Sequence, residues 1–226
     1  MNHFSKFSVT KRLLILEVLF SAISFGISIY IKVFGRSSIV TFFLLCFHLV
    51  PNALFLFPWT IITTSFVDAN VFTLLSSILI LSVYGVEIER SWGHKEYLLF
   101  CQFLTVIPNI AVLIPCFIAY KITDSHYLLV AIIQSTTAIQ AGILTAWYQL
   151  YSCKKEESSN KFLCPLSKYL IYLFLSIHLF YVFQSFPWTY FCLAVSGTCI
   201  SELYVLFVHP VVQELFHLES HTQLPI

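Results

Sequence analysis

Residues 97–120 read YLLFCQFLTVIPNIAVLIPCFIAY and contain no charged side chain. A run of this length provides the roughly 20 apolar residues that an α-helix needs to cross a bilayer core about 30 Å thick. Further apolar stretches lie on either side of it, at 13–34, 70–86, 127–151, 165–183 and 190–208. The sequence therefore predicts an all-α fold, a polytopic membrane bundle of about six transmembrane helices.

The composition of the 226-residue chain agrees with a lipid environment. Hydrophobic residues make up 58% and charged residues 10%, whereas a soluble domain usually carries about 25% charge. A net charge of +1 offers no basic field for nucleic acid. The 7 cysteines form no CxxC pair, so small packing residues are expected rather than a metal cluster or a disulfide framework. We expect the bilayer as surroundings, and no nucleic-acid partner, metal or cofactor.

One stretch between the first two predicted helices is interrupted. Residues 40–50 are apolar but too short to span a bilayer, and Pro51, Pro58 and Trp59 follow closely. Proline removes a backbone donor, and unpaired backbone groups are costly in lipid. We therefore expect residues 37–66 to form a re-entrant or interfacial segment, or a short surface helix, rather than a full span.

Lysine and arginine are distributed unequally among the predicted loops. One side of the membrane receives Lys6, Lys11, Arg12, Arg90, Lys95, Lys154, Lys155, Lys161 and Lys168. The other side receives Lys32, Arg36 and Lys121. The positive-inside rule then places both termini in the cytosol. Residues 1–12 form the cytosolic N-terminus, 13–209 the membrane domain and 210–226 a short cytosolic tail.

Two acidic residues, Glu17 and Glu202, lie within the predicted helices. A charged side chain at the centre of a helix costs about 2.5–3.5 kcal/mol on insertion scales. Each is therefore expected to reach the membrane interface, to tether helices inside the bundle, or to serve as a proton or partner site.

Small residues mark one face of two predicted helices. Ser135, Ala138 and Gly142 share a face of the fourth helix, and Gly197 and Ser201 share a face of the sixth. Small side chains allow two backbones to approach closely. We expect the fourth and sixth helices to pack tightly against each other.

The same helices leave two other functions to consider, an intramembrane hydrolase and a transporter. An intramembrane hydrolase needs a nucleophile beside a base; Thr137 offers a hydroxyl, but residues 190–208 contain no His or Lys. His178 is alone in the fifth predicted helix and is expected to be a core residue. Transporters usually show repeated broken helices, and Pro108–Asn109 is a single break. A protease with an atypical threonine nucleophile and a small-molecule transporter stay as alternatives.

The stretch from residue 51 to about residue 150 resembles the rhomboid-like superfamily. The matching residues are Pro58, Trp59, Asn70, Gly85, Glu89, Arg90, Trp92, Gly93, Pro108, Asn109, Gln140 and Gly142. Within that superfamily the chain is most similar to the transmembrane protein 115 family of Golgi rhomboid-like pseudoproteases. The last two helices match weakly.

The resemblance implies a rhomboid-like bundle whose first loop lies partly in the membrane. It aligns Thr137 with the rhomboid serine, with Ser135 and Ala138 in place of the flanking glycines. The rhomboid histidine position falls at 195–197, where this chain has no base. A dyad without a base cannot act as one, so the resemblance implies a pseudoprotease and not an enzyme.

The resemblance also implies a location and partners. Its family is associated with Golgi and endoplasmic reticulum membranes, with retrograde Golgi-to-ER transport and with a tethering complex. Membrane-protein clients or that complex are the implied partners, and a homo-oligomer stays open. Polar residues of the fourth helix and the charged turn 87–96 are the candidate contacts. In that turn we expect Glu89 and Arg90 to bond neighbouring loops and Trp92 to anchor at the membrane interface.

Overall fold

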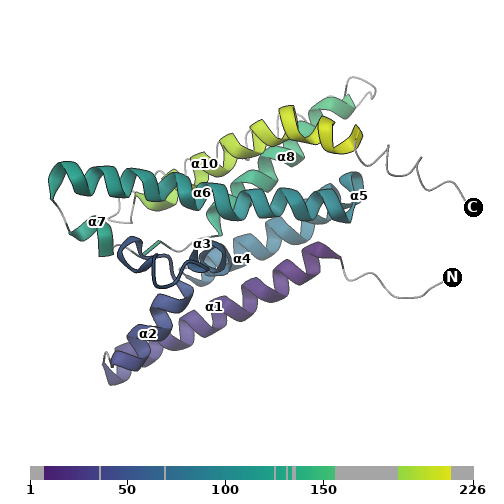
Figure 1. Cartoon of the computed structure of the whole chain (residues 1–226). Coiled ribbons are helices and arrows are strands. Elements are labelled where there is room, and N and C mark those ends of the chain that lie inside the picture. Colours follow the sequence, from purple (N-terminus) through teal and green to yellow (C-terminus); the bar gives the residue numbers. More distant parts are fainter. Residues whose placement is uncertain are drawn as a thin grey trace, which may run out of the picture.

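The computed structural model of the protein describes residues 8–35, 37–68, 70–124, 126–130, 132–133, 136–155 and 188–214. The elements are α1 (Val9–Phe34), α2 (Ser38–Phe47), η1 (Pro51–Ala53), α3 (Thr60–Thr63), η2 (Thr64–Phe66), α4 (Val71–Ile80), η3 (Leu81–Gly85), α5 (Val86–Trp92), α6 (His94–Thr123), α7 (Tyr127–Val130), α8 (Thr137–Lys155), α10 (Thr189–Leu203) and η4 (Tyr204–Val208). Figure 1 shows the long helices lying side by side as a bundle.

Four helices in the described residues are long and apolar enough to cross a membrane. They are α1, the continuous helix Val71–Trp92, α6, and the helix Thr189–Glu214 that contains α10. They correspond to the first, second, third and sixth predicted spans, and the prediction of a polytopic helical membrane bundle is confirmed. The fifth predicted span, 165–183, lies outside the described residues.

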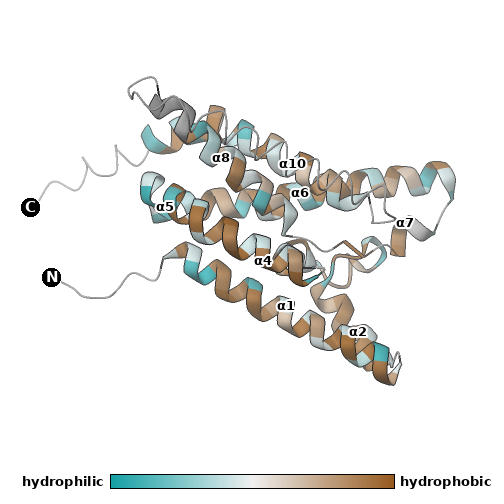
Figure 2. Cartoon of the chain, turned by 180° about the vertical axis from the view of Figure 1, so that it is seen from behind, coloured by the Kyte–Doolittle hydropathy of each residue, from teal (hydrophilic) through white to brown (hydrophobic). Residues whose placement is uncertain are grey.

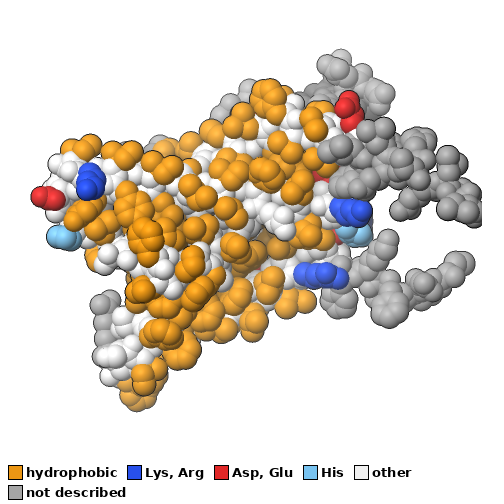
Figure 3. Space-filling view, in the orientation of Figure 1, with side chains coloured by type: hydrophobic (Ala, Val, Ile, Leu, Met, Phe, Trp, Pro, Cys, Tyr) orange, Lys and Arg blue, Asp and Glu red, His pale blue; other side chains and the backbone are white. Residues whose placement is uncertain are grey.

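The surface of the bundle is apolar and part of its interior is polar. Phe34, Phe72 and Ile122 are 74%, 79% and 78% exposed. Figure 2 shows that hydrophobic residues dominate the long helices, and Figure 3 shows apolar side chains covering the visible face between charged ends. The inward face of α1, by contrast, buries the polar residues Thr10, Glu17, Ser21 and Ser24. Such exposed apolar surface would be unfavourable in water and suits lipid.

The fourth predicted span begins later than the sequence suggests. The apolar run 127–151 predicts one helix, but α7 stops at Val130 and α8 starts at Thr137. Between them Ile133 pairs with Leu49 in an isolated antiparallel bridge, with N···O distances of 2.8 and 3.2 Å. Extended backbone at Ile133 cannot be helical, so the prediction of a single helix was wrong. The first three turns of α8 are buried, which makes α8 the central helix.

The interrupted segment after α1 folds back into the bundle. The 10-residue α2 packs on α1, the Ser24 hydroxyl lies 3.1 Å from the His48 ring nitrogen Nε2, and the Ser21 hydroxyl donates to the Phe66 carbonyl. These contacts lie in the middle of α1, far from its start. The prediction that residues 37–66 do not form a full span is therefore confirmed.

The two ends of the bundle carry different segments. The start of α1, the turn between α5 and α6, and the end of η4 lie together at one end (Figure 1). Contacts of Ser8 with Glu89 and of His209 with Glu96 join these segments. The described part of the chain therefore begins and ends at the same end of the bundle.

Candidate functional site

A polar network surrounds the start of the central helix α8. Thr136, directly before α8, donates to the Asp68 carboxyl at 2.7 Å and accepts from the Gln140 side-chain nitrogen at 2.7 Å. The Ser76 hydroxyl donates to the Gln140 side-chain oxygen at 3.3 Å. Each buried polar group in low dielectric needs such a partner. The network joins α4, α8 and the segment that precedes α4.

Two carboxyl groups meet at the edge of this network. Glu17 of α1 and Asp68 are each 1% exposed, and Asp68 is bonded to Ser21, which lies one helical turn from Glu17 on α1. The Asp68 backbone N–H donates to the Ser21 hydroxyl at 3.0 Å. Among the described residues, Glu17 Oε1, Asp68 Oδ2 and Ser77 Oγ are buried without a hydrogen-bond partner. Glu17 therefore lies inside the bundle, one of the positions that the sequence analysis left open for it. Glu202, by contrast, is exposed.

The sequence reasoning missed Asp68 and Thr136. Both are fully buried and joined by a hydrogen bond. The available signal was an acidic residue placed two positions before Asn70, which caps α4 by accepting from the Thr73 backbone N–H at 2.9 Å. An acidic group so close to an apolar run has to be exposed at the interface or buried with a partner.

The small residues of α8 and α10 form a direct backbone contact. A methyl group placed at Gly197 would lie 2.3 Å from the Ala138 carbonyl oxygen and 2.8 Å from its Cα. One turn further along, the Ser201 hydroxyl donates to the Gly142 carbonyl at 2.8 Å. At Gly142 a methyl group would meet Leu104 of α6 at 2.4 Å. The structure thus brings Ala138, Gly142, Gly197 and Ser201 together, as expected of a small-residue interface.

The region aligned with the rhomboid nucleophile lies at this contact. Thr137 starts α8 and is 1% exposed. Ser135 and His178 lie outside the described residues. On α10 the buried residues from Leu193 to Ser201 are Leu193, Ala194, Gly197 and Ser201, and none of them is a base. The buried residues in this described part of α10 therefore include no base that could pair with a hydroxyl of α8.

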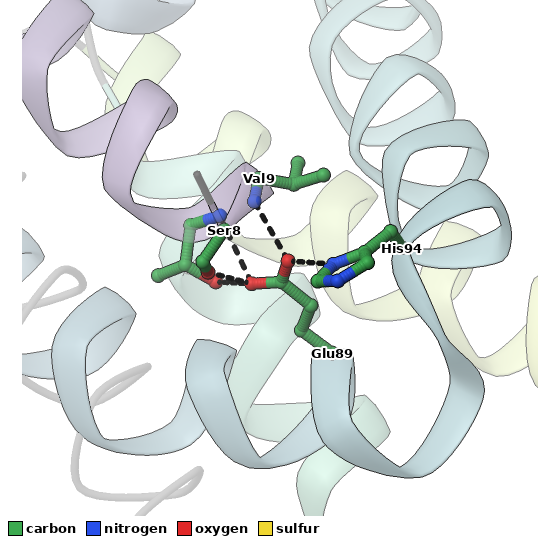
Figure 4. A network of polar contacts seen from close by, with 5 residues as sticks. Ser8, Val9, Glu89 and His94 are labelled. Atoms are coloured by element: carbon green, nitrogen blue, oxygen red, sulfur yellow. Dashed lines mark hydrogen bonds and ion pairs between the residues drawn. The ribbon is translucent and has the colours of Figure 1, made fainter. Parts of the chain in front are cut away.

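Glu89 links helix α5 to the start of α1. Its carboxylate accepts from the Val9 backbone N–H at 2.6 Å, from the Thr10 backbone N–H at 3.1 Å, and from the Thr10 hydroxyl at 2.6 Å. Ser8 and His94 also contact it, and Figure 4 shows Glu89 between these partners. The first N–H groups of a helix lack partners within the helix and favour a negative charge. Glu89 therefore caps α1 from a distant part of the chain.

The other residues of the turn behave differently. Arg90 is exposed, and Gly93 joins α5 to α6 with a positive φ of 88° that favours glycine. Trp92 does not anchor at the interface as expected, because its ring packs inward against Phe100 at 5.2 Å and against Tyr204 at 6.1 Å. The aromatic core offers more apolar contact than the membrane surface, which explains the difference.

Gly85 is also closely packed in the core. A methyl group at Gly85 would lie 2.7 Å from the Tyr97 hydroxyl.

Helix α6 continues through Pro108. The Asn109 side-chain nitrogen lies 2.6 Å from the Ile61 carbonyl, 2.8 Å from Ser65 Oγ and 2.9 Å from the Thr105 carbonyl. Asn109 therefore connects α6 to α3 and η2. These bonds do not reach the carbonyl of residue 104, which Pro108 leaves without its helical donor.

The loop residues Pro58 and Trp59 lie on the exposed side of the re-entrant segment. The Trp59 indole N–H donates to the Cys46 carbonyl at 3.0 Å, which ties the loop to α2. A cavity of about 370 Å³ lies between α2 and η1 and is lined mainly by apolar residues. Across the described ranges, no group of three or more His, Cys, Asp or Glu side chains could hold a metal ion.

Comparison with known proteins places the chain in a family. The family described as "Eukaryotic integral membrane protein (DUF1751)" matches residues 11–214. No solved structure matches the chain. The matched range includes every residue of the polar network and of the α8–α10 contact. The chain therefore belongs to the DUF1751 family of eukaryotic integral membrane proteins.

Proposed function

We propose that the protein is a non-catalytic, rhomboid-like membrane protein of the Golgi and endoplasmic reticulum, of the transmembrane protein 115 type. It supports Golgi-to-ER retrograde transport by binding membrane clients or tethering factors. The sequence resemblance at residues 51–150 supports this assignment, and the family match over residues 11–214 is consistent with it. Both termini face the cytosol in this proposal, in agreement with the unequal distribution of lysine and arginine.

The contact between α8 and α10 carries the non-catalytic part of the proposal. A hydrolytic dyad needs a base within about 2.6–3.2 Å of its nucleophile. Here Gly197 lies against the Ala138 backbone so closely that even a methyl group would overlap it. A histidine at that position would need the two helices to separate. The contact therefore favours a packing role for the residues around Thr137.

The structure narrows the surface that partners could use. Thr136, Thr137 and Gln140 at the start of the central helix are 1% exposed, so these three polar residues are not available to clients. The charged end of the bundle is available, because Lys11, Arg12, Arg90 and Lys95 have exposed side chains there. Basic side chains near a membrane surface attract acidic protein segments and anionic lipids. We propose this end as the face for tethering factors.

Proximity labelling in cells tests the cellular part of the proposal. A labelling enzyme fused to the C-terminus should mark Golgi and ER membrane proteins and subunits of a tethering complex. The same chain with Lys11, Arg12, Arg90 and Lys95 changed to Gln should keep its location and lose labelling of the tethering subunits. Neighbours drawn mainly from the plasma membrane or from mitochondria would rule out the proposed location.

A second experiment addresses transport itself. Cells that lack the protein should return a retrograde reporter from the Golgi to the ER more slowly, and the intact chain should restore the rate. Normal reporter return in the absence of the protein would remove the transport role and leave the fold assignment untouched.

A further inference from the structure

Glu17 and Asp68 form a pair of acidic groups inside the membrane domain that the proposed function does not use. They come from distant parts of the chain, and both side chains are 1% exposed. One oxygen atom of each carboxyl group is buried without a hydrogen-bond partner in the part of the chain that the structure describes. Ser77 of α4 is 0% exposed, its hydroxyl also lacks a partner there, and it faces Glu17.

Among the described residues, the groups that contact the pair carry no positive charge. Asp68 itself is the titratable group that acts on Glu17, and Ser77 faces Glu17 from α4. Asp68 is contacted by Ser21 from α1, by Thr73 from α4, and by Thr136 from the start of α8. Within the described residues, these partners are hydroxyl or backbone groups. Two carboxylates held together away from water, without a cation, cannot both ionise at low cost.

A carboxylic acid can resolve this conflict through its own proton. When one group is protonated, it gains an O–H that can donate to the other carboxylate, and the pair then carries a single negative charge. Oxygen atoms that otherwise lack a partner become a donor and an acceptor. The Ser77 hydroxyl, which can donate or accept, can then join the same hydrogen bond network.

We propose that Glu17 and Asp68 together form a proton-binding site, and that the bound proton fastens α1 to the segment before α4. Loss of the proton places two negative charges in the contact and loosens the middle of α1. The neighbouring contacts Ser21–Phe66 and Ser24–His48 lie one and two turns along the same face of α1. They are the next to weaken. The site therefore makes the attachment of α1 depend on pH.

The sign of the pH dependence follows from linkage. The shared proton is bound at low pH and released as the pH rises, and only the protonated pair joins α1 to the segment before α4 without placing two negative charges in the contact. The stabilisation is therefore fully present at low pH and is lost as the pH rises through the range in which the folded pair releases its proton.

Infrared spectroscopy of the intact chain in lipid nanodiscs tests the proposal. The carbonyl band of a protonated carboxyl group should be present at neutral pH and should disappear as the pH is raised. Glu17→Gln should remove this band at neutral pH while keeping a side chain of nearly the same shape. Glu202→Gln changes an exposed acidic residue of the membrane domain and should leave the band intact.

Thermal unfolding gives a second readout, in which the pH dependence of the melting temperature is compared between the natural chain and the variant. The melting temperature of the natural chain should fall as the pH rises above neutral, and that of Glu17→Gln should change much less. A natural chain without the protonated carboxyl band at neutral pH would overturn the proposal. A band that disappears on addition of sodium or potassium at constant pH would also overturn it, because a metal cation would then occupy the site in place of the proton.

Discussion

Replacing Gly197 by alanine should destabilise the bundle more than any other single added methyl group at a glycine of α8 or α10. The new carbon would lie 2.3 Å from the Ala138 carbonyl oxygen, where ordinary contacts begin at 3.4 Å. Its nearest atoms are backbone atoms, which cannot rotate away, so α10 must shift by roughly 1 Å. Overpacking of this kind costs about 1–3 kcal/mol. A shift of α10 would also weaken the bond from Ser201 to the Gly142 carbonyl, for about 1 kcal/mol more.

The expected loss is therefore about 2–4 kcal/mol of unfolding free energy. Unfolding of the purified protein in detergent, followed by circular dichroism as SDS or temperature increases, measures it. Gly26→Ala is the matched control, because Gly26 lies in the helix α1 with nothing within 4 Å of an added methyl group. That control should be neutral or stabilising by up to about 1 kcal/mol. A Gly197→Ala protein as stable as the Gly26→Ala control would refute the close backbone contact.

Two further substitutions test individual connections. Glu89→Ala removes the cap of α1 and should cost about 3 kcal/mol of unfolding free energy, with faster amide hydrogen exchange at the start of α1. The control Arg90→Ala changes an exposed neighbour and should cost almost nothing. Equal effects of the two substitutions would exclude the cap. Asn109→Leu should cost about 1–3 kcal/mol and speed hydrogen exchange in residues 60–66, whereas Gln102→Leu, exposed on the same helix, should change neither. Unchanged exchange in 60–66 after Asn109→Leu would contradict the proposed link.

The membrane spans could be predicted because length and apolarity are encoded locally. Helix α6 encloses the predicted span 97–120, and the helix Val71–Trp92 starts one residue inside the predicted span 70–86 and extends past its end. The start of the central helix was not predicted. Polar residues at 134–137 interrupt the apolar run 127–151, but hydroxyl and amide side chains also occur at contacts between transmembrane helices, so this cluster alone does not require a break. The break depends on the pairing of Ile133 with Leu49, and no local sequence pattern predicts this long-range contact.

The candidate site also has a part that could be predicted from the sequence and a part that could not. The small residues around Ala138 and Gly197 follow a helical spacing, so their contact could be anticipated from the sequence. The meeting of Glu17 with Asp68 could not, because Asp68 lies in an irregular segment whose burial depends on the folding of the whole re-entrant loop. Trp92 was assigned to the interface from a general preference of tryptophan, and the aromatic core around Tyr204 overrode that preference.

The absence of catalysis is the central claim, and a fluorophosphonate probe tests it directly. The intact protein in nanodiscs should show no labelling above that of the Thr137→Ala variant, while an active rhomboid protease treated in parallel should be labelled. The reason is that the described part of α10 presents backbone and small residues, not a base, to the start of α8. Specific labelling of the natural chain that is lost in Thr137→Ala would show an activated hydroxyl and contradict the account.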